Sequence, residues 1–162
     1  MYEAFLDIET TGLSLSYSDI TVIGVYLVGN RLKKMVQFVG EEVTAENLHK
    51  TLKNVHTIYT YNGSRFDLPF IRDWLGVDLK ETHNHCDLMY DCWRKNLYGG
   101  LKRVEIQLEI DRELKDIDGY QAVVLWWRYR NQGDKEALKL LLHYNREDVM
   151  NLTLLKEKLR AP

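Results

Sequence analysis

Two carboxylates one residue apart lie near the start of the chain, in the stretch DIETTG that begins at Asp7. They follow the apolar run 4–6, which is typical of a strand in a protein core. Successive side chains of a strand point to opposite faces, so Asp7 and Glu9 point to the same face. Their negative charges repel each other unless a cation lies between them. The pair therefore predicts a cation site at the end of a strand.

A further carboxylate lies in the helix that we predict over Lys135–Leu159. At about 100° per residue, the aliphatic residues of this helix form one stripe. They are Leu138, Leu141, Leu142, Val149, Leu152 and Leu159. Asp148 falls on the margin of this stripe, and Tyr144, one turn earlier, lies on the same margin. We therefore expect Asp148 to face inward or nearly so, although a charged residue at such a margin is usually half exposed.

The remaining candidate is Asp67, in the stretch YNGSRFDLPFI over 61–71. This stretch is typical of a strand end, a turn and the first turn of a helix, where the helix dipole alone favours a carboxylate. Asp67 and Asp148 nevertheless come from elements that could converge on the Asp7 pair. Four oxygen ligands without Cys or His suit Mg²⁺ or Mn²⁺ better than zinc. Two such ions about 4 Å apart would form a phosphoryl-transfer site.

Apolar periodicity and turn residues predict the elements that position these side chains. The predicted strands are Tyr2–Glu9, Thr21–Val28, Leu32–Val39 and Thr57–Tyr61. Gly29-Asn30 is expected to be a two-residue hairpin turn, which makes the first three strands an antiparallel meander. The predicted helices are Ala45–Leu52, Phe66–Leu75, Asp87–Leu97, Leu101–Leu108, Gln121–Arg130 and Lys135–Leu159. This order predicts an α/β or α+β fold, with helices packed on the faces of a mixed sheet.

Three stretches, DIETTG, YNGSRFDLPFI and YNREDV, resemble in this order the motifs of the DnaQ-like 3′-to-5′ exonuclease superfamily, which has a ribonuclease H-like fold. The tyrosine of the last motif is typical of the DEDDy branch, shared with proofreading domains of DNA polymerases. GGLKRVEIQL and YNREDVMNLTLL are similar to later segments of the YprB-like ribonuclease H-like domains. The resemblance implies a central mixed five-stranded sheet, an antiparallel three-strand meander plus parallel strands, in one domain over residues 1–162.

The resemblance also implies a role for each motif residue. Asp7 would bridge two divalent metal ions. Glu9 and Asp148 would hold the ion that binds the attacking water, and Asp67 would hold the other ion. Tyr144 would orient that water.

His143 offers an alternative, because HYNRED also fits the histidine branch of the superfamily, in which a histidine is the general base. On a regular helix His143 lies about 140° from Asp148, whereas Tyr144 lies about 40° away. We therefore expect Tyr144 to act at the site and keep His143 as the alternative.

Four residues are candidates for binding the substrate strand: Thr10, Asn62, Phe66 and Lys102. Asn62 would line the path of the strand by resemblance, although an ordinary turn Asn also explains it. Lys102 lies just inside a predicted helix and could hold a phosphate near its N-terminus, or be a solvated charge. The aromatic run WWRYR at 126–130 could stack bases, but core packing is favoured for at least one tryptophan.

The stretch HNHCDLMYDC at 83–92 suggests zinc, but its spacing matches no common ligand pattern. A helix cap by Asp87 and packed thiols are favoured instead. Two cysteines are too few for a disulfide framework, and the start Met-Tyr-Glu-Ala lacks the features of a signal peptide, so we expect a cytoplasmic protein. No apolar stretch is long enough to span a membrane.

The net charge of -2 excludes a polybasic nucleic-acid coat but not a nuclease whose metal ions supply positive charge. The sequence thus predicts a metal-dependent exonuclease acting on 3′ ends of single-stranded DNA or RNA, with two Mg²⁺ or Mn²⁺ ions. The alternative is a catalytically silent nucleic-acid-binding or scaffold domain of the same fold. An endonuclease of ribonuclease H type is less favoured, because the Asp-x-Glu pair and the Tyr-x-x-x-Asp helix together are typical of exonucleases.

Overall fold

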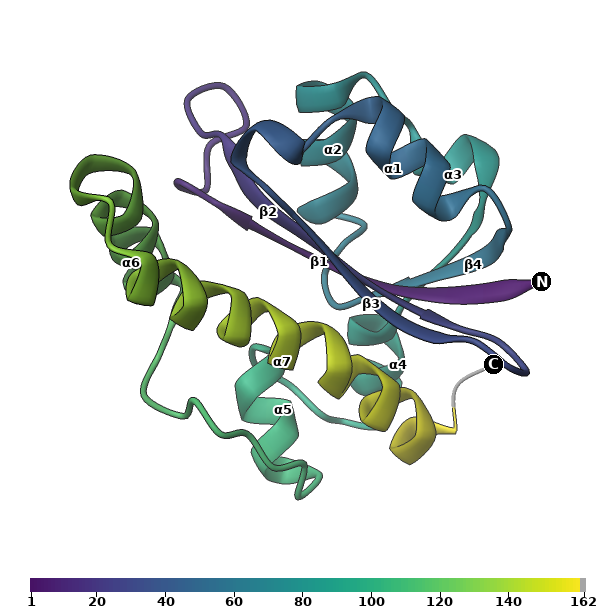
Figure 1. Cartoon of the computed structure of the whole chain (residues 1–162). Coiled ribbons are helices and arrows are strands. Elements are labelled where there is room, and N and C mark those ends of the chain that lie inside the picture. The colour runs from purple at the N-terminus through teal and green to yellow at the C-terminus, as the bar shows by residue number, and fades with distance from the viewer. Residues whose placement is uncertain (161–162) are drawn as a thin grey trace.

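The computed structural model describes residues 1–160, which are built around a five-stranded sheet (Figure 1). Its strands are β1 (Tyr2–Thr10), β2 (Ile20–Val28), β3 (Lys33–Val39), β4 (Val55–Thr60) and β5 (Asn84–Asp87). They lie in the order β3-β2-β1-β4-β5. β1, β2 and β3 form an antiparallel meander, and β4 and β5 add in parallel on the other side of β1. The predicted mixed α/β sheet is confirmed, and its central strand is the one that carries Asp7 and Glu9.

Helices cover both faces of the sheet (Figure 1). They are η1 (Gly40–Glu42), α1 (Ala45–Leu52), α2 (Asp67–Leu75), α3 (Leu79–Thr82), α4 (Leu88–Arg94), α5 (Leu101–Gln107), α6 (Gly119–Gln132) and α7 (Lys135–Leu159). α1, α2 and α3 lie on one face, and α4, α5 and α7 lie on the other. Across residues 1–160, no helix combines the length and the apolar character that a membrane span requires.

The alternation of β1 decides which layer each of its side chains enters. Ala4, Leu6 and Ile8 are buried in the core shared with α1 and α2. Phe5 points the other way, into the core shared with α4 and α7. Because the side-chain period of a strand is two, Asp7 and Glu9 share the face of Phe5 and point toward the α7 layer.

A glycine on β2 lets α7 approach the sheet beside Asp7. Gly24 pairs with Asp7 across the β1–β2 ladder. A Cβ at Gly24 would lie 2.2 Å from Oδ1 of Asn145 and 2.9 Å from Cγ2 of Val149, both on α7. Any larger residue would therefore push α7 away from the end of β1 that carries the carboxylates.

Several predicted boundaries are corrected by the structure. The resemblance implies a fifth strand without placing it in the sequence, and α3 was not predicted, because four-residue elements are too short to show a period. The β2–β3 turn lies one position later than predicted, since Gly29 and Leu32 exchange backbone hydrogen bonds around 30–31. The helix predicted to begin at Asp87 starts at Leu88 and ends at Arg94.

The buried face of α7 also differs from the predicted stripe. Leu138 and Leu142 are only partly buried, whereas Tyr144, Asn145 and Asp148 are buried. Tyr144 and Asp148 therefore lie within the buried face and not on its margin. The physical reason is that this part of α7 packs over the polar end of β1, so polar side chains take inward positions that apolar periodicity assigns to leucines.

Candidate active site

Three of the four predicted carboxylates form a compact cluster. Oxygen atoms of Asp7, Glu9 and Asp148 lie within 4.8 Å of one another. The first two come from the end of β1 and the third from the middle of α7. Glu9 is 9% exposed and Asp148 is 8% exposed, while Asp7 is partly buried. Carboxylates from opposite ends of the chain thus meet where α7 crosses the central strand β1.

Asp67 lies beside this cluster but is not part of it. Its Oδ2 accepts a hydrogen bond from the backbone N–H of Ile8 at 3.0 Å. β4 pairs with β1 only as far as Phe5, so the edge of β1 beyond Phe5 has no strand next to it on that side. α2 begins at this point, and the buried side chain of Asp67 satisfies the exposed edge of β1 between Asp7 and Glu9.

The electrostatics of the four carboxylates favour a bound cation. Burial raises the pKa of Asp67 to about 7 and that of Asp148 to about 6, the latter against the opposing effect of Arg112. Burial and the charge of Asp148 raise the pKa values of Asp7 and Glu9 well above their usual ranges. Oε1 of Glu9 is buried without a hydrogen-bond partner. An all-oxygen donor set with one unsatisfied buried oxygen fits a hard divalent cation such as Mg²⁺ or Mn²⁺.

Asn145 and Gln37 form a chain of hydrogen bonds that ends on Asp7. The sequence analysis missed both residues. Nδ2 of Asn145 donates to the backbone oxygen of Asp7 at 3.3 Å and to its Oδ2 at 3.4 Å. Nε2 of Gln37 donates to Oδ1 of Asn145 at 2.9 Å and to the Leu142 carbonyl at 2.8 Å. Asn145 could have been found, because it lies on the same helical face as Asp148. Gln37 carries no comparable local signal.

Tyr144 is buried near the carboxylates, and two positively charged side chains lie close to its ring. The Nζ of Lys102 lies 4.6 Å from the centre of its ring, and the guanidinium carbon of Arg112 lies 5.9 Å away. Burial first, and then the charges of Asp148 and the β1 carboxylates, raise the pKa of the phenol above its ordinary value. The hydroxyl of Tyr144 therefore stays protonated at neutral pH, so it can donate a hydrogen bond but cannot act as a general base.

His143 points away from the cluster. Its Nε2 lies 3.0 Å from Oε2 of Glu113 and 3.9 Å from Oε1 of Glu147. Together with Glu113 and Arg146 it lines an open cleft of about 560 Å³ between α7 and the 111–115 segment. The geometry therefore agrees with the helical phase that favours Tyr144 over His143.

Arg112 and Glu105 are two more site residues that the sequence analysis missed. Nη2 of Arg112 lies 2.6 Å from Oδ1 of Asp148, and the same guanidinium binds both oxygens of Glu105. Glu105 had a signal, because it lies on the apolar face of α5 with Leu101 and Val104. Arg112 had none, because the segment between α5 and α6 has no periodic structure.

The four predicted substrate-binding residues have different surroundings. Oγ1 of Thr10 donates to the Gly12 carbonyl at 2.6 Å, at the end of β1. Asn62 has a left-handed backbone, φ 60°, and a buried Oδ1 without a hydrogen-bond partner. Phe66 packs its ring 4.8 Å from that of Phe70, against the core. Of the four, Lys102 is the one that contacts Tyr144 at the acidic cluster.

Asp87 caps a helix, as predicted, and also holds the turn before α2. Its carboxylate accepts from the backbone N–H of Met89 at 3.1 Å, which caps α4. It also accepts from the N–H of Asn62 at 2.8 Å, the N–H of Ser64 at 3.0 Å and the Ser64 hydroxyl at 2.8 Å. Asp87 is therefore a structural carboxylate whose oxygens are fully used.

The tryptophans of α6 divide between core and surface. Trp126 is buried against α7, which confirms core packing for one of the pair. Trp127 is 44% exposed. Arg130 lies 5.3 Å from the Trp126 ring and forms an ion pair with Glu41 at 2.8 Å.

Comparison with known proteins shows which family this chain resembles. A profile of the RNase H superfamily matches residues 4–160. The uncharacterized protein YprB of Bacillus subtilis (strain 168) is 29% identical over 167 aligned positions. The alignment covers 91% of this chain and 39% of YprB. This chain therefore spans about two-fifths of the length of that relative.

Solved structures share the fold at lower identity. The family B DNA polymerase of the hyperthermophilic archaeon Pyrobaculum calidifontis superposes with a TM-score of 0.75 at 16% identity, covering 99% of this chain and 24% of the polymerase. Brucella melitensis NrnC with bound Mg²⁺ gives a TM-score of 0.53 at 19% identity, covering 98% of this chain and 83% of NrnC. The superfamily match extends from β1 to the end of α7 and includes all four carboxylates. The chain therefore belongs to the RNase H superfamily.

Proposed function

We propose that residues 1–162 form a 3′-to-5′ exonuclease domain of the DEDDy type, which hydrolyses phosphodiester bonds at the 3′ end of single-stranded DNA or RNA. The observation that carries the proposal is the cluster of Asp7, Glu9 and Asp148, with Asp67 beside it and one buried oxygen of Glu9 unpartnered. A purely structural cluster of this kind would be strained by repulsion between its carboxylates. A catalytically silent binding domain would have no need to keep all four.

The arrangement supports two cation positions that share Asp7. Asp7, Glu9 and Asp148 would hold one ion, because their oxygens already converge. Asp67, outside that group but next to β1, would hold the second ion together with Asp7. The cation bound in Brucella NrnC is Mg²⁺, which agrees with the donor set found here. When bound, such ions acidify a water and stabilise negative charge on the leaving oxygen.

The neighbouring residues would orient the reacting groups. Tyr144 keeps its proton and would donate a hydrogen bond to the attacking water or to a phosphate oxygen. Lys102, held over the Tyr144 ring, brings a positive charge to the side of the site where a phosphate backbone would enter. Asn145 would keep the carboxylate of Asp7 in place through its two hydrogen bonds to that residue.

Digestion of oligonucleotides tests this proposal directly. We expect 5′-labelled single-stranded DNA or RNA to give a ladder that shortens from the 3′ end with Mg²⁺ or Mn²⁺, and no products with EDTA. A blocked 3′ end should prevent trimming, and Asp7→Asn should serve as the inactive control. Internal cuts in the blocked substrate would instead indicate an endonuclease. Metal-independent binding without any cutting would indicate the silent binding domain.

A further inference from the structure

Arg112 occupies a buried position between Glu105 and Asp148. The side chains of Arg112 and Glu105 are only 5% and 2% exposed. Nε and Nη2 of the guanidinium donate to the two carboxylate oxygens of Glu105 at 2.9 and 2.6 Å. The same Nη2 lies 2.6 Å from Oδ1 of Asp148. One planar guanidinium thus joins α5 to the carboxylate that α7 contributes to the acidic cluster.

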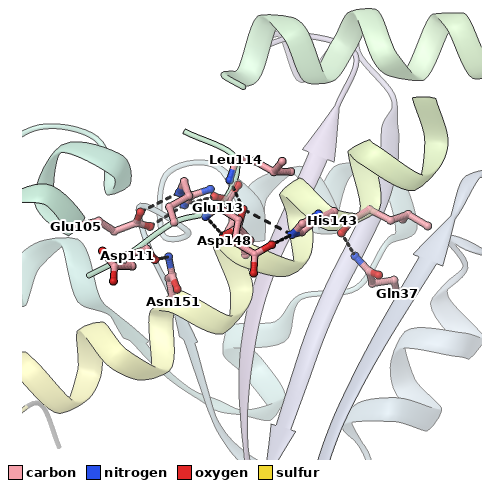
Figure 2. A network of polar contacts seen from close by, with 11 residues as sticks. Gln37, Glu105, Asp111, Glu113, Leu114, His143, Asp148 and Asn151 are labelled. Carbon is pink, nitrogen blue, oxygen red and sulfur yellow. Dashed lines mark hydrogen bonds and ion pairs between the residues drawn. The ribbon is translucent and has the colours of Figure 1, made fainter. Parts of the chain in front are cut away.

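The backbone on both sides of this arginine is fastened to α7. The carboxylate of Glu147 accepts from the N–H groups of Glu113 at 2.7 Å and Leu114 at 2.8 Å. Nδ2 of Asn151 donates to the Asp111 carbonyl at 3.2 Å. In Figure 2 the labelled residues Asp111, Glu113 and Leu114 lie beside α7 close to Asp148 and Asn151. The position of the guanidinium is therefore set by the helix that carries Asp148.

The charges indicate more than a simple counterion. Glu105 and Arg112 together carry no net charge, so the guanidinium holds one oxygen of Asp148 without adding net positive charge to the cluster. Asp148 at the same time places an oxygen within 4.8 Å of oxygens of Asp7 and Glu9. Nη1 of Arg112 is buried without a hydrogen-bond partner, which does not favour stability. An arrangement optimised only for folding would satisfy every donor of the guanidinium.

We propose that Arg112, oriented by Glu105, is a positioning residue that holds the Asp148 carboxylate in the orientation required for cation binding. The inference rests on the proposed function for the existence of a metal centre. Residues that orient metal ligands typically change metal affinity by about 10- to 100-fold when they are removed. Arg112 contacts Asp148. In this proposal it acts through Asp148 and does not contact the substrate or the reacting atoms.

The test is a titration of the whole chain with Mn²⁺, with free Mn²⁺ measured by its EPR signal. The main variant is the double change Glu105→Leu with Arg112→Met, which removes both buried charges so that neither is left unpaired. Arg112→Lys is the second variant, because it keeps the charge but loses the planar fork. Arg128→Met is the matched control, since it breaks the partly exposed ion pair with Asp134.

We expect the double variant to bind Mn²⁺ about 10- to 100-fold more weakly than the wild type, Arg112→Lys to lie between them, and the control to be unchanged. Wild-type affinity in a folded double variant would overturn the proposal even if its melting temperature were lower. If the double variant does not fold, unchanged affinity in Arg112→Lys overturns it.

Oligonucleotide digestion by the same proteins separates this inference from the proposed function. Weakened Mn²⁺ binding in the variants, together with a wild type that binds Mn²⁺ but digests nothing, would reject the exonuclease and support the positioning role. Digestion by the wild type, with unchanged Mn²⁺ affinity in the variants, would reject the positioning role and support the exonuclease.

Discussion

Asp87 on β5 and the acidic cluster on β1 and α7 differ in how the protein satisfies their carboxylate oxygens. Asp87, at the end of β5, accepts four hydrogen bonds, three from backbone N–H groups and one from the Ser64 hydroxyl. At the end of β1, Asp7, Glu9 and Asp148 crowd together, and Oε1 of Glu9 has no partner. A buried carboxylate that serves the fold is surrounded by donors.

The difference shows how a structural and a functional carboxylate can be told apart. The donors around Asp87 satisfy both of its carboxylate oxygens, so the side chain stabilises the turn before α2 and the start of α4. In the acidic cluster, burial and neighbouring charges raise the pKa values and make the metal-free state unfavourable. The proposed cation would offset this repulsion when it binds.

The largest effect is expected for Asp7→Asn, which removes one charge from the cluster at nearly constant shape. Turnover should fall by about a thousandfold or more, because several kcal/mol of transition-state stabilisation depend on the metal ligands. In EDTA the melting temperature should stay the same or rise, since a repelling charge is gone. Nuclease rates and thermal melting measure both. A clear loss of metal-free stability would show that Asp7 is structural, like Asp87.

A smaller loss is expected for Tyr144→Phe, which keeps the ring and removes the hydroxyl. Turnover should fall about ten- to a thousandfold, in line with a hydrogen bond that matters mainly in the transition state. His143→Ala is the matched control and should change turnover little, because His143 contacts Glu113 outside the cluster. Rates of both variants across pH decide the point. An inactive His143→Ala beside a near-normal Tyr144→Phe would place the chain in the histidine branch.

Asp87→Ala should lower stability more than turnover. A helix cap alone would account for about 1 kcal/mol. Because this carboxylate also satisfies the 62–64 turn, we expect the free energy of unfolding to fall by about 3 kcal/mol. Asp78→Ala, which removes the cap of α3, a single hydrogen bond from the Lys80 N–H, is the control and should lose about 1 kcal/mol. Urea unfolding measures both, and equal losses would contradict the multiple role of Asp87.

The smallest effect is a pH dependence of the metal-free stability. The folded-state pKa values of Asp67, about 7, and Asp148, about 6, are raised above those of an unfolded chain. Between pH 4 and about 7 the folded state therefore binds more protons, so its stability is greatest at the acidic end of this range and falls as the pH rises.

Melting in EDTA at pH 5 and pH 8 should accordingly give a melting temperature a few degrees higher at pH 5. Mn²⁺ should reverse the trend, because it binds the deprotonated carboxylates. The Asp7→Asn variant should show a weaker pH dependence. A metal-free protein that is more stable at pH 8 would contradict the raised pKa values.

Local periodicity was enough to predict part of the fold and most of the cluster. The period of a strand places Asp7 and Glu9 on one face whatever the strand packs against. The period of a helix likewise puts Tyr144 near Asp148 and turns His143 away. The start and end of α7 were also predicted, because Asp134 caps its first turn and its apolar pattern is long.

Other features depend on contacts between segments that are distant in the chain. Asp67 satisfies the edge of β1 only because β4 stops at Phe5, and Arg112 reaches Asp148 from a segment without a period. No local pattern encodes such contacts, since they arise when packing brings separate elements together. The residue types for a metal site are thus readable along the chain. Their distances, their raised pKa values and the contact of Arg112 with Asp148 depend on how α7 packs against the sheet and against the 111–115 segment.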